Sequence, residues 1–256
     1  MKKILFIFLT FLLTLTGCLN SEASQKEVTP KKVQPISTNP SNEEKPKKEK
    51  QYNGNPQVKK VIHNVPLIKQ RPELPFGCEV TSTAMMLQYA GVHVSKMDLY
   101  KAVKKDDDPI VIKNGDILQW GDPSEGFVGD MTGKTGRGYA VFDEPIEDLV
   151  NQFLPGRAIN LTNEPFEKIL NHIKNGYPVV VWTTGDYRLP NQWEEWMHNG
   201  KKIKTPIDLH VVTLVGFDQH FVYLNDPLSG KKNVKVNKHQ FIQSWKALQS
   251  RAVSYY

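Results

Sequence analysis

One thiol, that of Cys78, stands in a stretch of the sequence that could do chemistry. The stretch runs over residues 76–82 (FGCEVTS) and begins a segment of helical periodicity. A helix N-terminus lowers the pKa of a thiol, because the helix dipole and the free N–H groups favour the thiolate, which is the nucleophilic form. The alternative is a small cysteine buried in a core, which is common for an isolated cysteine. The function of Cys78 therefore depends on which side chains meet it.

A histidine and an aspartate are predicted to meet at one end of a β-hairpin. Residues 209–217 (LHVVTLVGF) and 221–224 (FVYL) are typical of strands, and residues 218–220 separate them. In an antiparallel hairpin a residue ahead of the turn pairs with one about as far behind it, so His210 and Asp226 should share the open end. Asn225 could orient the imidazole instead, although a carboxylate stabilises an imidazolium better. Thiol, imidazole and carboxylate follow in the order that a papain-like thiol enzyme uses.

The helix that must carry Cys78 is predicted over residues 78–90. Val80, Ala84 and Leu87 recur at helical spacing, and Gly91 fits the position that ends a helix. Further helices are predicted over residues 95–103, 144–153, 165–174 and 238–248, and further strands over 63–68, 178–183 and 233–236. Residues 106–142 and 186–205 show no sustained period and are predicted to be mostly loop. These elements indicate an α+β fold, in which an N-terminal helix with the cysteine packs on an antiparallel sheet with the histidine and the aspartate.

The first 60 residues differ in composition from the rest of the chain. Basic residues precede an apolar run at 4–15, which has the length of a signal-peptide core and is short for a membrane span. The run ends in Leu-Thr-Gly-Cys, which resembles a bacterial lipobox, so residues 1–17 are predicted to be a signal peptide and Cys18 the lipidated first residue. Residues 18–60, rich in Lys, Glu, Pro and Asn, are predicted to be a disordered tether, which leaves residues 61–256 as the folded domain. These features predict a lipid-anchored protein on the outer face of the bacterial cytoplasmic membrane.

The charge of the chain lies in the predicted signal peptide and tether. The formal net charge is +6, whereas residues 61–256 carry 22 Lys and Arg against 22 Asp and Glu. A neutral domain without a basic patch gives no electrostatic footprint for a polynucleotide, so no nucleic-acid partner is expected.

The sequence resembles the C39-like cysteine peptidase family, a papain-fold group related to the peptidase domains that trim double-glycine leaders. The resemblance covers most of residues 62–250. It rests on Gln70 followed by GCEVTS from residue 77, on GDP at 121–123 with GFVG at 126–129, on LHVV from residue 209, and on NDP at 225–227. The resemblance depends on the occurrence of all four motifs in this order and spacing.

The resemblance implies a role for four side chains. Cys78 is then the nucleophile, His210 the general base and later acid, Asp226 the orienting carboxylate, and Gln70 forms an oxyanion hole with the backbone N–H of Cys78. One such oxyanion donor is worth about 3 kcal/mol of transition-state stabilisation. The sequence departs from the leader-trimming enzymes at Glu79, where they commonly have a small residue, and it lacks their transporter segments. A double-glycine leader substrate is therefore not expected.

These features predict a thiol hydrolase, most simply a cysteine peptidase that acts as a monomer on peptide or protein substrates. Two alternatives use the same chain: a cell-wall peptide amidase or acyltransferase with the same triad, and a non-catalytic surface lipoprotein that binds peptides. No cofactor and no metal are expected, because the aspartates at 106–108, 122 and 130 lack the spacing of a calcium loop. The six histidines other than His210 show no zinc-ligand spacing and are expected to be structural.

Overall fold

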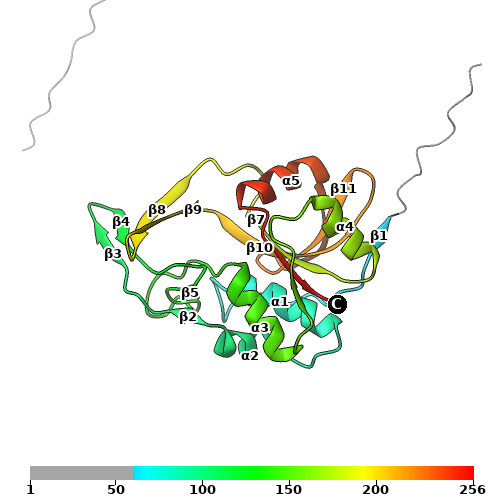
Figure 1. Ribbon diagram of the computed structural model, residues 1–256, viewed down its shortest axis with the longest axis horizontal. Helices are drawn as coiled ribbons and strands as arrows, with labels where there is room; N and C mark the ends of the chain where they lie inside the picture. Colours follow the sequence, from blue (N-terminus) through cyan, green and yellow to red (C-terminus); the bar gives the residue numbers. More distant parts are fainter. Residues whose placement is uncertain (1–59) are drawn as a thin grey trace, which may run out of the picture. The chain divides into compact units, whose positions relative to one another are not determined.

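The computed structural model describes residues 60–256, which form an α+β domain (Figure 1). The predicted signal peptide, the lipidation site Cys18 and all but the last residue of the predicted tether lie outside the described residues. The central sheet has seven strands in the order β12-β11-β10-β7-β13-β6, with β1 paired to β10 outside this path. Its strands are β1 (Val61–Ile62), β6 (Ala158–Asn160), β7 (Val179–Thr184), β10 (Leu209–Phe217), β11 (Phe221–Asp226), β12 (Lys231–Asn237) and β13 (Ala252–Tyr255). The helices are α1 (Cys78–Tyr89), α2 (Lys96–Ala102), α3 (Asp143–Phe153), α4 (Phe166–Lys174) and α5 (Lys238–Ala247).

Helices cover both faces of the central sheet, as Figure 1 shows. Alternate residues of β7 point to opposite faces, and every residue of this strand is buried. Val180 and Trp182 pack into the core that holds α1 and α3, whereas Val179 and Val181 pack into the core that holds α4 and α5. Burial on both faces explains why the sequence of β7 is a continuous apolar run rather than an alternating one.

The predicted helix at residues 78–90 is confirmed as α1, which ends as expected. Its residues from Cys78 to Leu87 are all buried, because the helix lies between the sheet and the neighbouring helices α2 and α3. Gly91 adopts a φ of +87°, the left-handed conformation that favours glycine after a helix C-terminus. The capping box at Ser95 is also present, since its hydroxyl accepts a hydrogen bond from the Asp98 backbone and the Asp98 carboxylate accepts one in return.

The strand predicted over residues 63–68 is wrong, because pairing with β10 covers only β1. The last sheet-like contact is the hydrogen bond that the His63 N–H donates to the Val215 carbonyl. Beyond it, Pro66 has no N–H to donate, and the side chain of Asn225 donates to the carbonyl of Val65. A side chain therefore replaces the ladder that would have continued the strand.

The loop predicted over residues 186–205 is also wrong, because most of it forms a β-hairpin. Strands β8 (Trp193–His198) and β9 (Lys201–Pro206) pair with each other, and β8 pairs with β4 (Asp116–Gln119), which pairs with β3 (Val111–Lys113). The segment 106–142 is therefore less irregular than predicted, and it further contributes β5 (Phe127–Val128), which pairs with β2 (Lys105–Asp106). Both missed hairpins turn at an Asn-Gly pair with positive φ, at residues 114–115 and 199–200.

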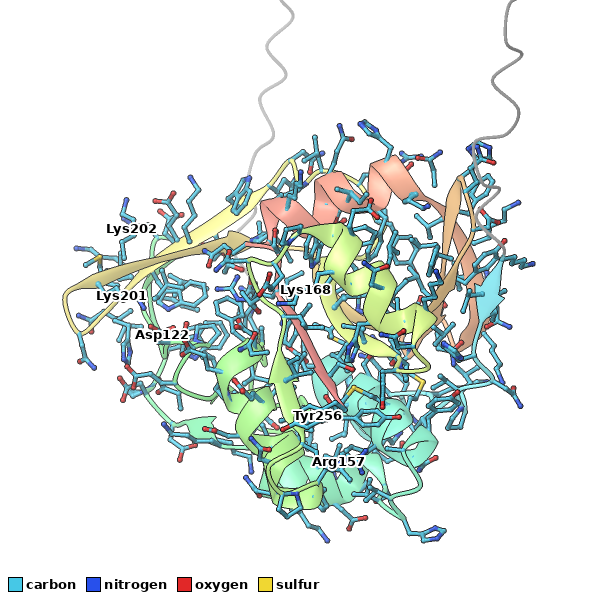
Figure 2. All side chains as sticks on the ribbon, turned by 45° about the vertical axis from the view of Figure 1, so that its right-hand side comes forward. Asp122, Arg157, Lys168, Lys201, Lys202 and Tyr256 are labelled. Carbon is cyan, nitrogen blue, oxygen red and sulfur yellow. The ribbon has the colours of Figure 1, made fainter. Side chains whose placement is uncertain are left out.

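The β8–β9 hairpin is tied to the segment that precedes α3. Lys201 forms an ion pair of 2.8 Å with Asp122, and both side chains are labelled in Figure 2. The indole N–H of Trp196 donates to the carbonyl of Gly121 at 2.8 Å, and its ring meets Tyr139 edge to face. The two segments predicted as separate loops thus form one small layer with its own buried aromatic core. Within residues 60–256, the helices are too short and too polar to cross a membrane.

Candidate active site

Cys78 is the first residue of α1 and lies on the face of the helix that meets the sheet. Gly77 precedes it with no room for a side chain, since a Cβ there would lie 2.6 Å from the Cβ of Leu74. The residue Cys78 is 7% exposed. Helix α1 is further fixed to β10 by Ser82, whose hydroxyl donates to the Val211 carbonyl at 3.1 Å. The sulfur therefore lies beside the strand that carries the predicted base.

His210 and Asp226 meet as the hairpin prediction requires. Strands β10 and β11 pair with Thr213 opposite Asn225, which places the two side chains at the open end of the hairpin. The His210 Nε2 atom lies 2.8 Å from the Asp226 Oδ1 atom, and both side chains are buried. With Nε2 bound to the carboxylate, Nδ1 is the ring nitrogen left to exchange a proton with another group.

The carboxylate of Asp226 is held by several donors. Its Oδ1 also accepts the backbone N–H of Leu228 at 2.9 Å, and its Oδ2 accepts the hydroxyl of Tyr187 at 3.0 Å. Burial raises the pKa of Asp226, but the hydrogen bond and charge of His210, together with the donors at Ser229 and Leu228, outweigh it and hold the pKa well below its usual value. Asp226 is therefore ionised at neutral pH and suited to orient and stabilise an imidazolium.

Asn225, the alternative orienting residue, is engaged elsewhere. Its amide nitrogen donates to the carbonyls of Val65 and Pro66, and its Oδ1 accepts the backbone N–H of Asn233. The carboxylate rather than the amide thus contacts the imidazole.

Gln70 lies next to the turn that follows Asp226. Its backbone N–H donates to the Pro227 carbonyl at 3.0 Å, and the residue is 2% exposed. The amide nitrogen donates one of its two hydrogens to the Pro75 carbonyl at 2.7 Å, which leaves the second hydrogen free for a substrate oxygen. The Oε1 atom is buried and has no hydrogen-bond partner within residues 60–256. The structure thus brings Gln70, His210 and Asp226 into one neighbourhood.

The thiol of Cys78 is not activated in the way that the sequence predicted. Its Sγ donates to the Oε2 atom of Glu79 at 3.3 Å, and within the described domain it makes no hydrogen bond to His210. Burial raises the pKa of Cys78 well above its ordinary value, and the charge and hydrogen bond of Glu79 raise it further. The backbone N–H of Val211 lowers it, but by less. The lowered pKa that a helix N-terminus favours is therefore not found at Cys78, because burial and a neighbouring carboxylate outweigh the helix dipole.

Glu79 is the residue at this site whose role the sequence did not predict. Its side chain is fully buried, and its Oε1 accepts the backbone N–H of Val141 at 3.0 Å. Burial raises the pKa of Glu79 to about 7, against the lowering effect of the hydrogen bonds from its own backbone, from Val141 and from Cys78. The signal available in the sequence was a charged residue at the second position of an otherwise uncharged helix.

A group of possible metal ligands lies away from Cys78. Ligand atoms of Asp106, Asp108 and His198 lie within 4.8 Å of one another. The Asp106 carboxylate already accepts the backbone N–H groups of Asp108 and Asp122, at 3.0 and 2.8 Å. The same hydrogen bonds hold Asp106 and Asp108 in an acidic turn.

The fold and the site together define a papain-like α+β domain with a cysteine at a helix N-terminus and a His-Asp pair on the facing sheet. The sequence profile of the Peptidase_C39 like family matches residues 62–253, and the chain belongs to this family. It is 36% identical over 182 residues to the uncharacterized protein YvpB of Bacillus subtilis (strain 168), a match that spans 71% of this chain and 70% of that protein. A crystal structure from Bacillus anthracis, described as a candidate C39-like peptidase, superposes with a TM-score of 0.71 at 40% identity. It covers 77% of this chain and 97% of that one.

The family and the fold point to a hydrolase of the cysteine peptidase type. The papain-like α+β architecture predicted from the sequence is thereby confirmed, as is the C39-like resemblance. The catalytic roles of Cys78, His210, Asp226 and Gln70 remain predictions.

Proposed function

We propose that the chain is a cysteine peptidase anchored by lipid at Cys18 to the outer face of the bacterial cytoplasmic membrane, where it cleaves peptide bonds as a monomer. The observation that supports the catalytic part is the buried contact of 2.8 Å between His210 Nε2 and Asp226 Oδ1, because His210 lies on β10, the strand against which the Cys78 helix packs. The anchoring part rests on the lipobox-like sequence alone.

In the proposed reaction, Nδ1 of His210 takes the proton of the Cys78 thiol, and the sulfur attacks the carbonyl carbon of the substrate. The carbonyl electron pair moves to the oxygen, where the Gln70 amide and the Cys78 backbone N–H stabilise the negative charge. The C–N bond then breaks, and the leaving amine takes the proton from His210. Water gives a proton to His210, and its oxygen attacks the thioester carbon. The C–S bond then breaks, the carboxylic acid is released, and the sulfur takes the proton back from His210. Asp226 keeps the imidazole oriented throughout.

The test separates the peptidase from its closest alternative. The protein is incubated with unrelated peptides and with purified cell-wall peptides, separately, and new amine termini are counted. Peptide cleavage that Cys78→Ala abolishes is the expected result, whereas cleavage or transfer confined to wall peptides identifies the amidase or acyltransferase with the same triad. Full activity in Cys78→Ala contradicts any thiol mechanism. For the anchor, Cys18→Ala should move the protein from the membrane fraction to the soluble fraction.

A second candidate, a non-catalytic peptide-binding protein, is favoured by one observation. The pKa of the Cys78 thiol is raised by burial and by Glu79, so the nucleophile is in its unreactive form in this structure. This candidate requires that Cys78→Ala retain peptide binding and that the wild-type protein cleave none of the bound peptides. The peptidase proposal instead requires that the sulfur be released from Glu79 during the reaction.

A further inference from the structure

The carboxylate of Glu79 sits between the nucleophile and the segment that precedes α3. One oxygen contacts Cys78 Sγ at 3.3 Å, and the other accepts the Val141 N–H at 3.0 Å. The carbonyl of Val141 accepts the indole N–H of Trp182 at 3.1 Å, so this peptide unit is fixed on both sides by buried side chains. The position of Glu79 is therefore set by the core rather than by solvent, and its contact with the thiol is part of a fixed arrangement.

Glu79 has no compensating positive charge within residues 60–256. The interactions that stabilise its carboxylate are hydrogen bonds, from two backbone N–H groups and from the thiol. The titratable groups that face it are the Cys78 thiol from α1 and the Tyr139 phenol from the segment before α3. From β10, His210 is bound to Asp226, whereas α2, α3 and β7 contribute no ionisable group that perturbs it. A buried carboxylate of this kind is costly and takes up a proton readily.

We propose that Glu79 is a positioning residue that keeps Cys78 as a neutral thiol while its carboxylate is ionised and allows the thiolate to form when the carboxyl is protonated. An ionised carboxylate accepts the S–H proton and repels a thiolate. A protonated carboxyl has an O–H that can donate to the thiolate and stabilise it. We call this suppression of the Cys78 thiolate by the ionised Glu79 carboxylate the latch. The proposal rests on the function proposed above, because the latch affects catalysis only if the sulfur is a nucleophile.

The latch predicts a distinct pH dependence for the reactivity of Cys78. With Glu79 protonated, the thiolate fraction rises tenfold for each pH unit. As Glu79 ionises near pH 7, each further increase in pH is offset by the new repulsion, so the rise flattens. A thiol without such a neighbour shows no flattening until it is itself ionised. A merely structural Glu79, holding Val141 in place, would not produce this shape.

The experiment is the rate of iodoacetamide labelling of Cys78 between pH 5 and pH 9, read by mass spectrometry of the peptide that contains it. The wild-type rate should rise tenfold per pH unit below 7 and clearly less between 7 and 8. In Glu79→Gln the flattening should disappear, and the rate at pH 8 should exceed that of the wild type at least tenfold. Equal profiles for the two proteins overturn the proposal.

The titration of a histidine near the thiol could also flatten the rise of the labelling rate with pH, so His210→Gln is the control. A flattening that persists in His210→Gln is the expected result, and one that vanishes there assigns the effect to the imidazole and overturns the proposal. This variant keeps the test decisive if Glu79→Gln does not fold. Labelling does not require hydrolysis, so a protein that shows the flattening but cleaves no peptide contradicts the proposed function and leaves the latch intact.

Discussion

The protonation of Glu79 should make the stability of the domain depend on pH in an unusual direction. The pKa of this carboxyl is about 7 in the folded protein, against 4.5 for an ordinary glutamate, because the side chain is fully buried. The folded state therefore binds a proton more tightly than the unfolded state. A raised pKa of this kind contributes stability that is fully present below pH 4.5 and is lost as the pH rises through 7. Most carboxylates with hydrogen-bond partners act in the opposite sense.

The magnitude follows from the two pKa values. At about 1.4 kcal/mol for each pH unit that separates them, the protonated carboxyl contributes about 3 kcal/mol to the free energy of unfolding. Glutamine has the same shape as the protonated acid and does not titrate. The free energy of unfolding of the wild type, relative to Glu79→Gln, should therefore fall by about 3 kcal/mol between pH 4.5 and pH 8.5.

Urea unfolding of both proteins across this pH range measures the difference directly, and the contributions of the other ionisable groups cancel in the comparison. Glu167→Gln, at an exposed position in the first turn of α4, is the matched control and should track the wild type at every pH. The reasoning would be refuted if the difference in unfolding free energy between wild type and Glu79→Gln stayed constant within about 1 kcal/mol across this pH range. The carboxyl would then have nearly the same pKa in the folded and unfolded states.

Three further predictions concern neighbouring groups. Asp143→Asn removes the partner of the buried Arg251, whose Nε lies 2.9 Å away, and should cost about 3 kcal/mol in urea unfolding; a loss below 1 kcal/mol would show that Arg251 is satisfied by its other acceptors. Tyr187→Phe deletes a hydrogen bond to the ionised Asp226, so kcat/KM for a cleaved peptide should fall about tenfold without a comparable loss of stability, and an unchanged rate would contradict a role for this hydroxyl. Gly77→Ala places a Cβ where a neighbouring side chain stands and should lower the thermal unfolding midpoint by several degrees, whereas an unchanged midpoint would mean that α1 can shift at no cost.

The His-Asp contact could be predicted from the sequence because it depends on a local pattern. Two apolar runs on either side of a three-residue turn bring their outer ends together. His210 lies eight residues before that turn and Asp226 lies six residues after it, so both fall at the open end of the hairpin. The Asn-Gly pairs at 114–115 and 199–200 carried an equally strong hairpin signal. These hairpins were missed because the strands around them are short and rich in charged residues. The alternation of apolar and polar residues that indicates a strand is therefore weak in them.

The ionisation state of the thiol could not be predicted from local pattern. It depends on the burial of Cys78 under segments far away in the sequence and on the side chain of Glu79 turning toward the sulfur. The strands β6 and β13 were missed for a related reason, since each has four residues or fewer and pairs only with partners distant in the chain. Tertiary contacts decide such features, and a single sequence does not display them.

The place of β13 in the sheet constrains how the domain can assemble. This strand, from residues 252–255, lies between β7 and β6, so the sheet beyond β7 cannot close until nearly the last residue of the described chain is available. Near the N-terminal end of the domain, β1 can pair only after β10 is available, more than a hundred residues later in the chain. Such long-range pairing gives a high contact order and slow folding. A chain exported from its N-terminus, as proposed above, would therefore emerge with helix α1 before the strands that bury this helix.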